Sequence, residues 1–254
     1  MKGQKVDSFL SQELTGEKFI ELVFSVDNEK EERTTSLISK GPTYASVGVL
    51  LQMLYKLSVC GYGCRKGDHK IEYLTGRAYN TSIASLKLLR IGFYDESLSL
   101  IRSVAEIINL LALFRIDTEE YDSWVSSSEK KRIRGFAPAS VRKKLEKKTD
   151  LEIPISKEYY SKLCEVGVHV NPKTRPAGYN IHDRAMVGGF VLDHAPIAIL
   201  NDLQYVVFFS VLISSSCTLE KEKFIEVTEI LKEHTLKFDE LSIMNLGVCR
   251  TFRL

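Results

Sequence analysis

The spacing of apolar residues constrains this chain more than any other feature, because they recur every three or four positions through long stretches without helix breakers. Proline accounts for only 6 of the 254 residues. A repeat of three to four matches one face of an α-helix, whereas a half-buried strand alternates apolar and polar residues. We therefore predict an all-α protein built as a single helical-bundle domain.

Glycines mark where several of the predicted helices end, because glycine lowers helix preference and readily takes the left-handed conformation. Gly61 and Gly63 end the helix that follows Pro42, and Gly92 ends the next one. The third core helix is apolar on nearly every side, as is typical of a central helix. The helices predicted after Pro42 cover residues 69–91, 93–116, 118–128 and 156–166, two short helices within 129–148, and residues 196–214 and 219–241.

The start of the chain is predicted to stand apart from this bundle. We divide the chain into an N-terminal amphipathic segment with a linker, residues 1–33, and one helical domain, residues 34–254. The amphipathic part covers residues 7–24, and the acidic, polar residues 26–33 are interpreted as the linker. Residues 185–192 place two glycines between β-branched and apolar residues, which favours one small β-hairpin packed on the helices.

Composition and charge exclude several classes of protein. With 44% hydrophobic and 27% charged residues, the chain resembles a soluble globular protein. Its 35 basic and 33 acidic residues give a net charge of +2, so no protein-wide field selects nucleic acid or a membrane. The start lacks the apolar stretch of a signal peptide. The odd number of five cysteines favours reduced thiols, and we expect a cytoplasmic location.

The most apolar run of the chain, residues 195–217, is the segment that could be taken for a membrane-spanning helix. Asn201, Asp202 and Gln204 interrupt this run. Such groups are costly in lipid. We therefore predict a buried core helix and no membrane partner.

A polar stripe crosses the predicted central helix. Arg102, Glu106 and Asn109 are four and three residues apart and share one helix face, which Ser99 extends. A charge on so apolar a helix is unfavourable unless it is paired. One interpretation is a structural ion pair that fixes a neighbouring helix. The other is a preorganised site, in which Glu106 holds the Arg102 guanidinium ready for an oxyanion.

A histidine follows the predicted short helix 156–166. Gly167 is expected to end that helix, which leaves His169 just beyond it and Asn171 two residues later. The negative end of the helix dipole favours a protonated imidazole there. His169 is then either a capping residue or an acid–base residue that faces the polar stripe.

The spacing of histidine, cysteine and aspartate residues in the sequence does not favour a metal site. His182-Asp183 and Asp193-His194 only loosely resemble the ligand order of a His/Asp metal phosphohydrolase. The chain has no Cys-x-x-Cys pair of the kind that binds structural zinc. We expect neither a native metal nor a cofactor.

Residues 129–148 concentrate positive charge. They hold nine basic residues against Glu129 and Glu146, a net of 9 − 2 = +7. Such segregation can bind phosphates even in a near-neutral protein, although solvated lysine-rich helices are common. The chain has no glycine-rich phosphate loop, Walker motif or dinucleotide motif. The candidate nucleic-acid-binding residues are Lys130, Lys131, Arg132, Arg134, Arg142, Lys143, Lys144, Lys147 and Lys148.

Several short motifs together carry a resemblance to a known group. They are Gly92-Phe-Tyr-Asp-Glu-Ser, the stripe from Arg102 to Glu106, and Val168-His-Val-Asn-Pro172 after Tyr160. The chain from Tyr44 onward resembles small all-helical bacterial proteins distantly related to the HEPN superfamily and to abortive-infection proteins. The resemblance implies metal-independent RNA cleavage, in which a histidine assists transfer of the 2′-hydroxyl proton and an arginine stabilises charge on the phosphate.

The residues that would carry this chemistry are not in the usual HEPN spacing. Arg175 followed by His182 is the formal match, and it lies in a predicted loop rich in proline and glycine. The resemblance thus implies a ribonuclease effector of a bacterial defence or toxin system, acting as a homodimer or with a defence-system partner protein. A non-catalytic module that binds nucleic acid, nucleotide or protein is the alternative. The candidate catalytic residues are Arg102, Glu106, Asn109, His169 and Asn171.

Overall fold

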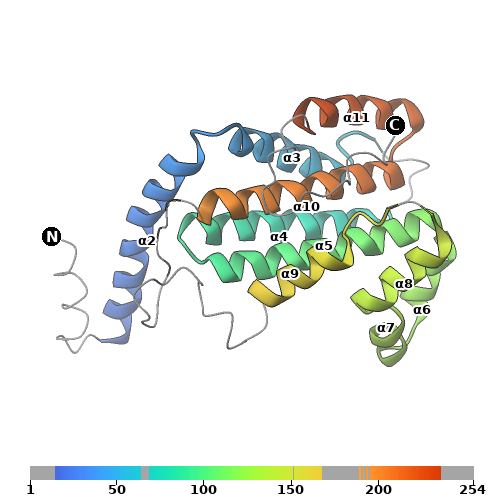
Figure 1. Ribbon diagram of the computed structural model, residues 1–254, viewed down its shortest axis with the longest axis horizontal. Helices are drawn as coiled ribbons and strands as arrows, with labels where there is room; N and C mark the ends of the chain where they lie inside the picture. Colours follow the sequence, from blue (N-terminus) through green and yellow to red (C-terminus); the bar gives the residue numbers. More distant parts are fainter. Residues whose placement is uncertain are drawn as a thin grey trace.

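The computed structural model describes residues 15–63, 69–150, 152–167, 189, 191, 193 and 195–235. Within these residues the chain forms ten α-helices and no strand, which confirms the all-α class and the single helical domain (Figure 1). The helices are α2 (Gly16–Ile38), α3 (Pro42–Ser58), α4 (Glu72–Arg90), α5 (Tyr94–Ile116), α6 (Thr118–Ser126), α7 (Glu129–Gly135), α8 (Pro138–Lys148), α9 (Lys157–Gly167), α10 (Ala195–Thr218) and α11 (Lys221–Thr235).

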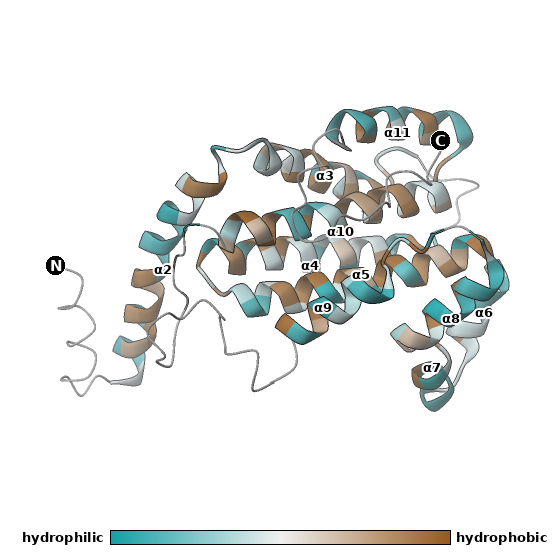
Figure 2. Ribbon diagram, viewed as in Figure 1, coloured by the Kyte–Doolittle hydropathy of each residue, from teal (hydrophilic) through white to brown (hydrophobic). Residues whose placement is uncertain are grey.

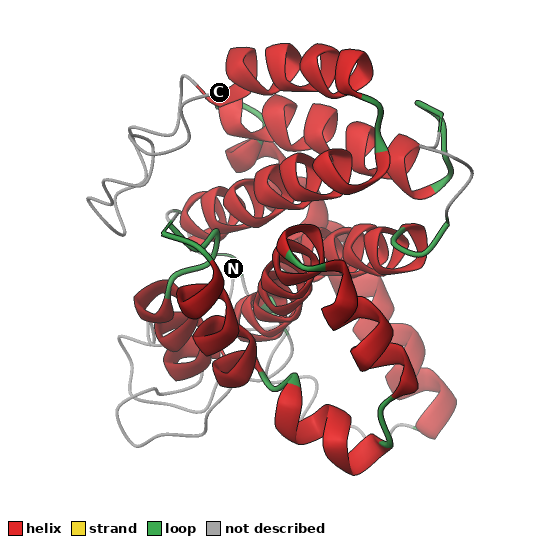
Figure 3. Cartoon of the chain, turned by 90° about the vertical axis from the view of Figure 1, so that its right-hand side faces the viewer, coloured by secondary structure: helices red, strands yellow, loops and turns green. Residues whose placement is uncertain are grey.

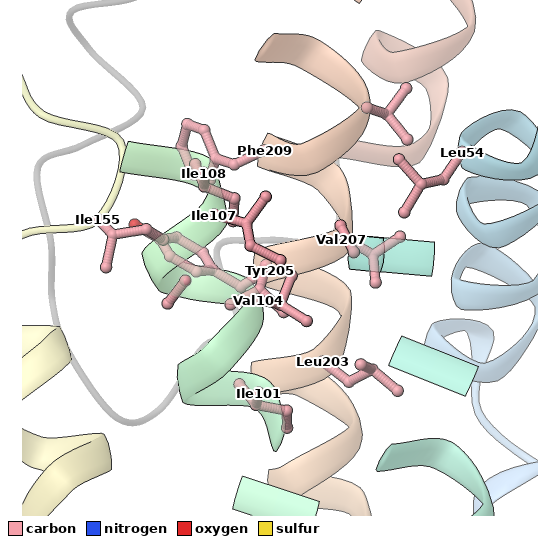
Figure 4. Close-up of a cluster of buried hydrophobic side chains, with 14 of the residues drawn as sticks. Leu54, Ile101, Val104, Ile107, Ile108, Ile155, Leu203, Tyr205, Val207 and Phe209 are labelled. Atoms are coloured by element: carbon pink, nitrogen blue, oxygen red, sulfur yellow. The ribbon is translucent and has the colours of Figure 1, made fainter. Parts of the chain in front are cut away.

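The apolar helices α5 and α10 form the centre of the bundle. Helix α10 packs against α3, α4 and α5, and α5 also packs against α8 and α9. Side chains of α5 and α10, among them Val104, Ile107 and Tyr205, gather between these two helices (Figure 4). Leu203 and Val207 of α10 lie on the opposite side of α10, as does Leu54 of α3. Ile101, Val104, Leu203 and Val207 are fully buried. Burial of each such side chain stabilises the fold by about 1.5–3 kcal/mol, so the packing on both sides of α10 contributes much of the stability of the bundle.

Both central helices are long and apolar enough to cross a membrane, by length and composition alone. In the structure, 67% of the apolar window of α5 and 78% of that of α10 are buried inside the bundle. The polar residues Asp202 and Gln204 of α10 are buried there too. The prediction of a buried core helix at residues 195–217 is therefore confirmed. Apolar and polar residues mix along the helices at the edge of the bundle (Figure 2).

Helix α2 shows that the predicted linker at residues 26–33 was wrong. The helix runs unbroken from Gly16 to Ile38 and crosses that segment (Figure 1). The segment contains neither proline nor glycine, and Lys30 Nζ lies 3.1 Å from Asp27 Oδ1 at helical spacing. An ion pair of 2.8 Å between Arg90 and Glu31 attaches α2 to α4. A polar, acidic segment is thus compatible with an exposed helix when its charges pair.

The turn from α4 to α5 forms as predicted around Gly92. Its φ of 82° is left-handed, and the N–H groups of Gly92 and Phe93 donate to the carbonyls of Leu89 and Leu88. This pattern is that of a glycine helix cap. The cap sets α4 and α5 side by side as a helical hairpin (Figure 1). Figure 3 shows the described part of the chain as helices joined by loops, without a strand.

Other predictions fall partly outside the described residues. Of the hairpin predicted at residues 185–192, only Gly189 and Val191 are described, and neither lies in a strand. Residues 7–14 of the amphipathic start and residues 236–241 of the last predicted helix also lie outside the described part. The two short helices predicted within residues 129–148 are present as α7 and α8.

Candidate functional site

The polar stripe of α5 meets α9 and the residues just before it. The Ser99 hydroxyl donates to the carbonyl of Gly167, at the end of α9. Arg102 and Glu106 both contact Tyr160 near the start of α9. The predicted shared face of α5 therefore exists, and its partner along the whole stripe is the α9 segment.

Asn109, the last residue of the stripe, holds the backbone of Ile155. Its Nδ2 donates to the Ile155 carbonyl at 2.9 Å, and its Oδ1 accepts from the Ile155 N–H at 3.1 Å. Asn109 is 4% exposed and Ile155 is fully buried. Because both ends of the amide are occupied by backbone, we assign Asn109 a structural role in placing α9.

Arg102, Glu106 and Tyr160 form a closed hydrogen-bonded triad. The Tyr160 hydroxyl accepts from Arg102 Nε at 3.0 Å and from Nη2 at 2.9 Å, and it donates to Glu106 Oε1 at 2.6 Å. Arg102 Nη2 also donates directly to Glu106 Oε1 at 2.5 Å. The side chains of Arg102 and Glu106 are 26% and 33% exposed, so solvent reaches the triad from one side. The guanidinium is therefore held in one orientation near the surface.

Arg102 stays charged and the Tyr160 hydroxyl stays neutral at neutral pH. Burial raises the pKa of the Tyr160 hydroxyl, and the hydrogen bond to Glu106 adds to this, while Arg102 opposes it. Burial lowers the pKa of Arg102, but the hydrogen bond with Tyr160 and the charge of Glu106 outweigh it, so the net pKa is raised. Tyr160 is thus a neutral hydroxyl that accepts from a permanent cation.

Arg142 of α8 brings a second guanidinium to the same tyrosine. Its central carbon lies 4.7 Å from the centroid of the Tyr160 ring, and that of Arg102 lies 5.4 Å from it. Arg142 Nη1 is buried and has no hydrogen-bond partner among the described residues. Two guanidinium groups therefore lie against Tyr160: that of Arg102 is paired with Glu106, and that of Arg142 has an unsatisfied donor and no ion pair among the described residues. We name Arg102, Glu106, Arg142 and Tyr160 the arginine–tyrosine site.

Gly167 fixes where the chain leaves this site. A Cβ built on Gly167 would lie 2.7 Å from Leu98 Cβ and 3.2 Å from the Asp95 carbonyl, which only glycine avoids. The end of α9 therefore lies directly on the first turns of α5, one turn before Arg102. The candidate residues His169 and Asn171 follow Gly167 in the sequence but lie outside the described residues, as do Arg175, His182, Asp183 and His194.

The basic residues of α7 and α8 divide into two groups. Lys144 Nζ lies 2.5 Å from Glu120 Oε2, and Lys148 Nζ lies 2.5 Å from Asp117 Oδ2, so these two lysines tie α8 to α6. Arg142 belongs to the arginine–tyrosine site, and Arg132 is half-buried. The exposed residues, with no ion pair among the described residues, are Lys130, Lys131, Arg134, Lys143 and Lys147.

Sequence reasoning did not separate the roles of Arg142 and Tyr160. From the sequence, Arg142 was predicted only as one of nine basic nucleic-acid-binding residues, and Tyr160 was noted only as part of a motif. The useful signal was the apolar spacing of Val141 and Leu145, which bury one face of α8 and so bring Arg142 toward α5. A cavity of about 340 Å³ lies elsewhere, between α3 and α4, where Tyr55, Tyr73 and Tyr79 line it.

Comparisons with protein-family models, with curated proteins and with solved structures find no match. What is established is therefore an all-helical protein of ten helices within its described residues, with a paired arginine–tyrosine site on its central helix.

Proposed function

We propose that this protein binds RNA and that the arginine–tyrosine site receives a phosphate group. The observation that carries the proposal is the buried Arg142 Nη1, which has no hydrogen-bond partner among the described residues. A buried donor left unsatisfied costs about 1–3 kcal/mol. An oxyanion supplies the missing acceptor and balances the second guanidinium, because Glu106 neutralises only one of the two.

The surroundings of the site favour a polymer over a free anion. Arg142 lies on α8, and the exposed residues Lys143 and Lys147 are on the same helix. Helix α7 adds Lys130, Lys131 and Arg134, all exposed. A chain of phosphates can contact several of these cations at once, whereas a single phosphate cannot.

A catalytic form of this proposal is a metal-independent endoribonuclease, as the HEPN resemblance implies. The tether between Ser99 and Gly167 favours it, because Gly167 precedes His169 by two residues and lies one turn from Arg102. In this mechanism Arg102, held by Glu106 and Tyr160, stabilises charge on the phosphate. His169 assists transfer of the 2′-hydroxyl proton. The protein would then act in the cytoplasm as a defence or toxin effector, as a homodimer or with a partner protein.

Binding to single-stranded RNA, measured by fluorescence anisotropy over a salt titration, tests the proposal. We expect Arg142→Gln to weaken binding about tenfold or more, because it removes a cation and the unsatisfied donor. Arg77→Gln is the matched control, since Arg77 is exposed on α4 and makes no hydrogen bond or ion pair with the residues of the site. Equal binding by the Arg142→Gln protein and the parent would overturn the proposal.

Cleavage is a separate measurement. If His169 and Arg102 act as described, RNA should be cut in the presence of EDTA and carry a cyclic phosphate end, and His169→Ala should abolish this in a folded protein. Retained activity in that variant excludes His169. RNA binding without cleavage supports the non-catalytic module instead.

A further inference from the structure

The connection from α3 to α4 contains an unusual backbone conformation at Cys60. Among the described residues, Cys60 is the one residue other than glycine with a positive φ, 55°. A side chain in this region is disfavoured and persists where the surroundings fix it. Here the N–H of Gly61 donates to the Lys56 carbonyl at 2.6 Å, which closes the turn after α3. The turn brings the Cys60 sulfur to the start of α4.

Three metal-ligating atoms meet at this point. Cys60 Sγ lies 3.3 Å from His69 Nδ1 and 3.6 Å from Glu72 Oε1. His69 Nδ1 lies 3.4 Å from Glu72 Oε1. The three residues lie just after α3, in the connection and in the first turn of α4, so the turn between these two helices brings their ligand atoms together.

These separations fit the edges of a zinc coordination tetrahedron. Zinc binds sulfur at about 2.3 Å and nitrogen or oxygen at about 2.0–2.1 Å, which places tetrahedral ligands about 3.3–3.6 Å apart. The distances from Glu72 to Cys60 and to His69 match a sulfur–oxygen and a nitrogen–oxygen edge, and the 3.3 Å between Cys60 Sγ and His69 Nδ1 is shorter than a sulfur–nitrogen edge by about 0.2 Å. A thiolate, a neutral imidazole and a carboxylate together carry two negative charges, which Zn²⁺ neutralises.

Glu72 is a buried carboxylate, so a cation beside it stabilises it more than it would stabilise an exposed carboxylate. It is 7% exposed, yet it has no ion pair with lysine or arginine among the described residues. Its Oε2 accepts from the backbone N–H of Ile71 at 3.2 Å, which leaves Oε1 toward the sulfur and the imidazole. A hydrogen bond on the second carboxylate oxygen is the usual outer-shell support for a metal ligand.

We propose that Cys60, His69 and Glu72 bind a zinc ion when Cys60 is reduced. Cys60 is disulfide-bonded in the structure, whereas Cys164 and Cys217 are free thiols, so the expectation that all the thiols are reduced was wrong. A thiol or phosphine reductant adds two electrons and two protons to the disulfide and yields two thiols. Zinc then displaces the Cys60 proton to solvent and takes the thiolate, and water completes the tetrahedron. Oxidation would release the ion, so the site is redox-gated.

Cobalt titration of the full chain, with and without a phosphine reductant, tests this site. Co²⁺ replaces zinc in such sites and reports a sulfur ligand through its thiolate-to-cobalt charge-transfer absorption. We expect one Co²⁺ per reduced chain, with this absorption present, and bleaching on addition of Zn²⁺, which binds more tightly. The oxidised protein should show no such absorption.

Variants of Cys60 and His69 distinguish these two ligands from other thiols and imidazoles of the chain. Cys60→Ser should remove the charge-transfer absorption, and His69→Gln should weaken Co²⁺ binding at least about tenfold. Because the His69 side chain is 64% exposed, His69→Gln leaves the bundle intact and remains informative if Cys60→Ser fails to fold. Cys217→Ser and His234→Gln are the controls and should bind as the parent does. The absence of stoichiometric Co²⁺ in the reduced parent, or an unchanged spectrum in Cys60→Ser, would overturn the proposal.

Discussion

The hydroxyl of Tyr159 on α9 donates a hydrogen bond to Oδ1 of Asp202 on α10, 3.0 Å away in the interior of the bundle. Both residues are buried. Burial raises the pKa of Asp202 to about 6, although the Tyr159 hydrogen bond and the charge of Lys162 oppose the rise. The contact therefore joins two helices through a carboxyl group that is protonated more readily in the folded chain than in the unfolded one.

This contact predicts a pH dependence of stability that Asp202→Asn should remove. Because the folded pKa of Asp202 exceeds its ordinary value of 3.8, its contribution to stability is fully present below about pH 4 and is lost as the pH rises through about 6. The difference corresponds to roughly 3 kcal/mol. At pH 7 the Asn variant should therefore unfold at higher denaturant concentration than the parent, since its amide oxygen still accepts from Tyr159.

Denaturant unfolding of parent and variant from pH 4 to pH 8 checks this prediction. The two stability curves should converge at low pH and separate as the parent loses stability. Asp193→Asn, on an 81% exposed side chain, is the control and should leave the parent curve unchanged. Parallel curves for the parent and Asp202→Asn would show that Asp202 does not titrate in this range.

The sequence predicted elements and faces well, because these follow from local spacing. The stripe from Ser99 to Asn109 was placed on one face of the central helix from intervals of three and four alone. Its partners were not predictable, since Tyr160 and Ile155 reach α5 only through the packing of α9. The linker prediction failed at residues 26–33 because composition does not reveal that Glu31 pairs with Arg90, far along the chain.

Tyr160→Phe should lower both stability and RNA binding. The change deletes the hydroxyl that accepts from Arg102 and donates to Glu106, while keeping the ring that both guanidinium groups approach. Loss of these hydrogen bonds should cost about 1–2 kcal/mol in the free energy of unfolding. Tyr55→Phe, on a half-exposed tyrosine of α3, is the matched control. An RNA affinity equal to that of the parent would show that the orientation of Arg102 does not matter for binding.

Gly167→Ala should destabilise the fold, whereas Gly48→Ala should stabilise it. The added methyl group at Gly167 meets Leu98 Cβ at 2.7 Å and the Asp95 carbonyl at 3.2 Å, so α9 must move off α5. At Gly48, inside α3, the same group meets nothing within 4 Å, and alanine favours a helix over glycine by about 1 kcal/mol. Thermal unfolding of the two variants should shift in opposite directions. Equal shifts would contradict the close contact at Gly167.

Charge reversal in α8 should separate RNA binding from folding, because its lysines have different partners. Lys143 and Lys147 are exposed and have no ion pair among the described residues, whereas Lys144 and Lys148 pair with Glu120 and Asp117 on α6. The double variant Lys143→Glu/Lys147→Glu should keep the parental melting temperature and weaken RNA binding. The slope of the logarithm of affinity against the logarithm of salt concentration should fall by an amount that corresponds to up to about two phosphate contacts. Lys144→Glu/Lys148→Glu places like charges against α6 and should lower the melting temperature. Unchanged RNA binding by the first variant across a salt titration would show that this face of α8 does not contact phosphate, and would confine any phosphate contacts to α7 and the arginine–tyrosine site.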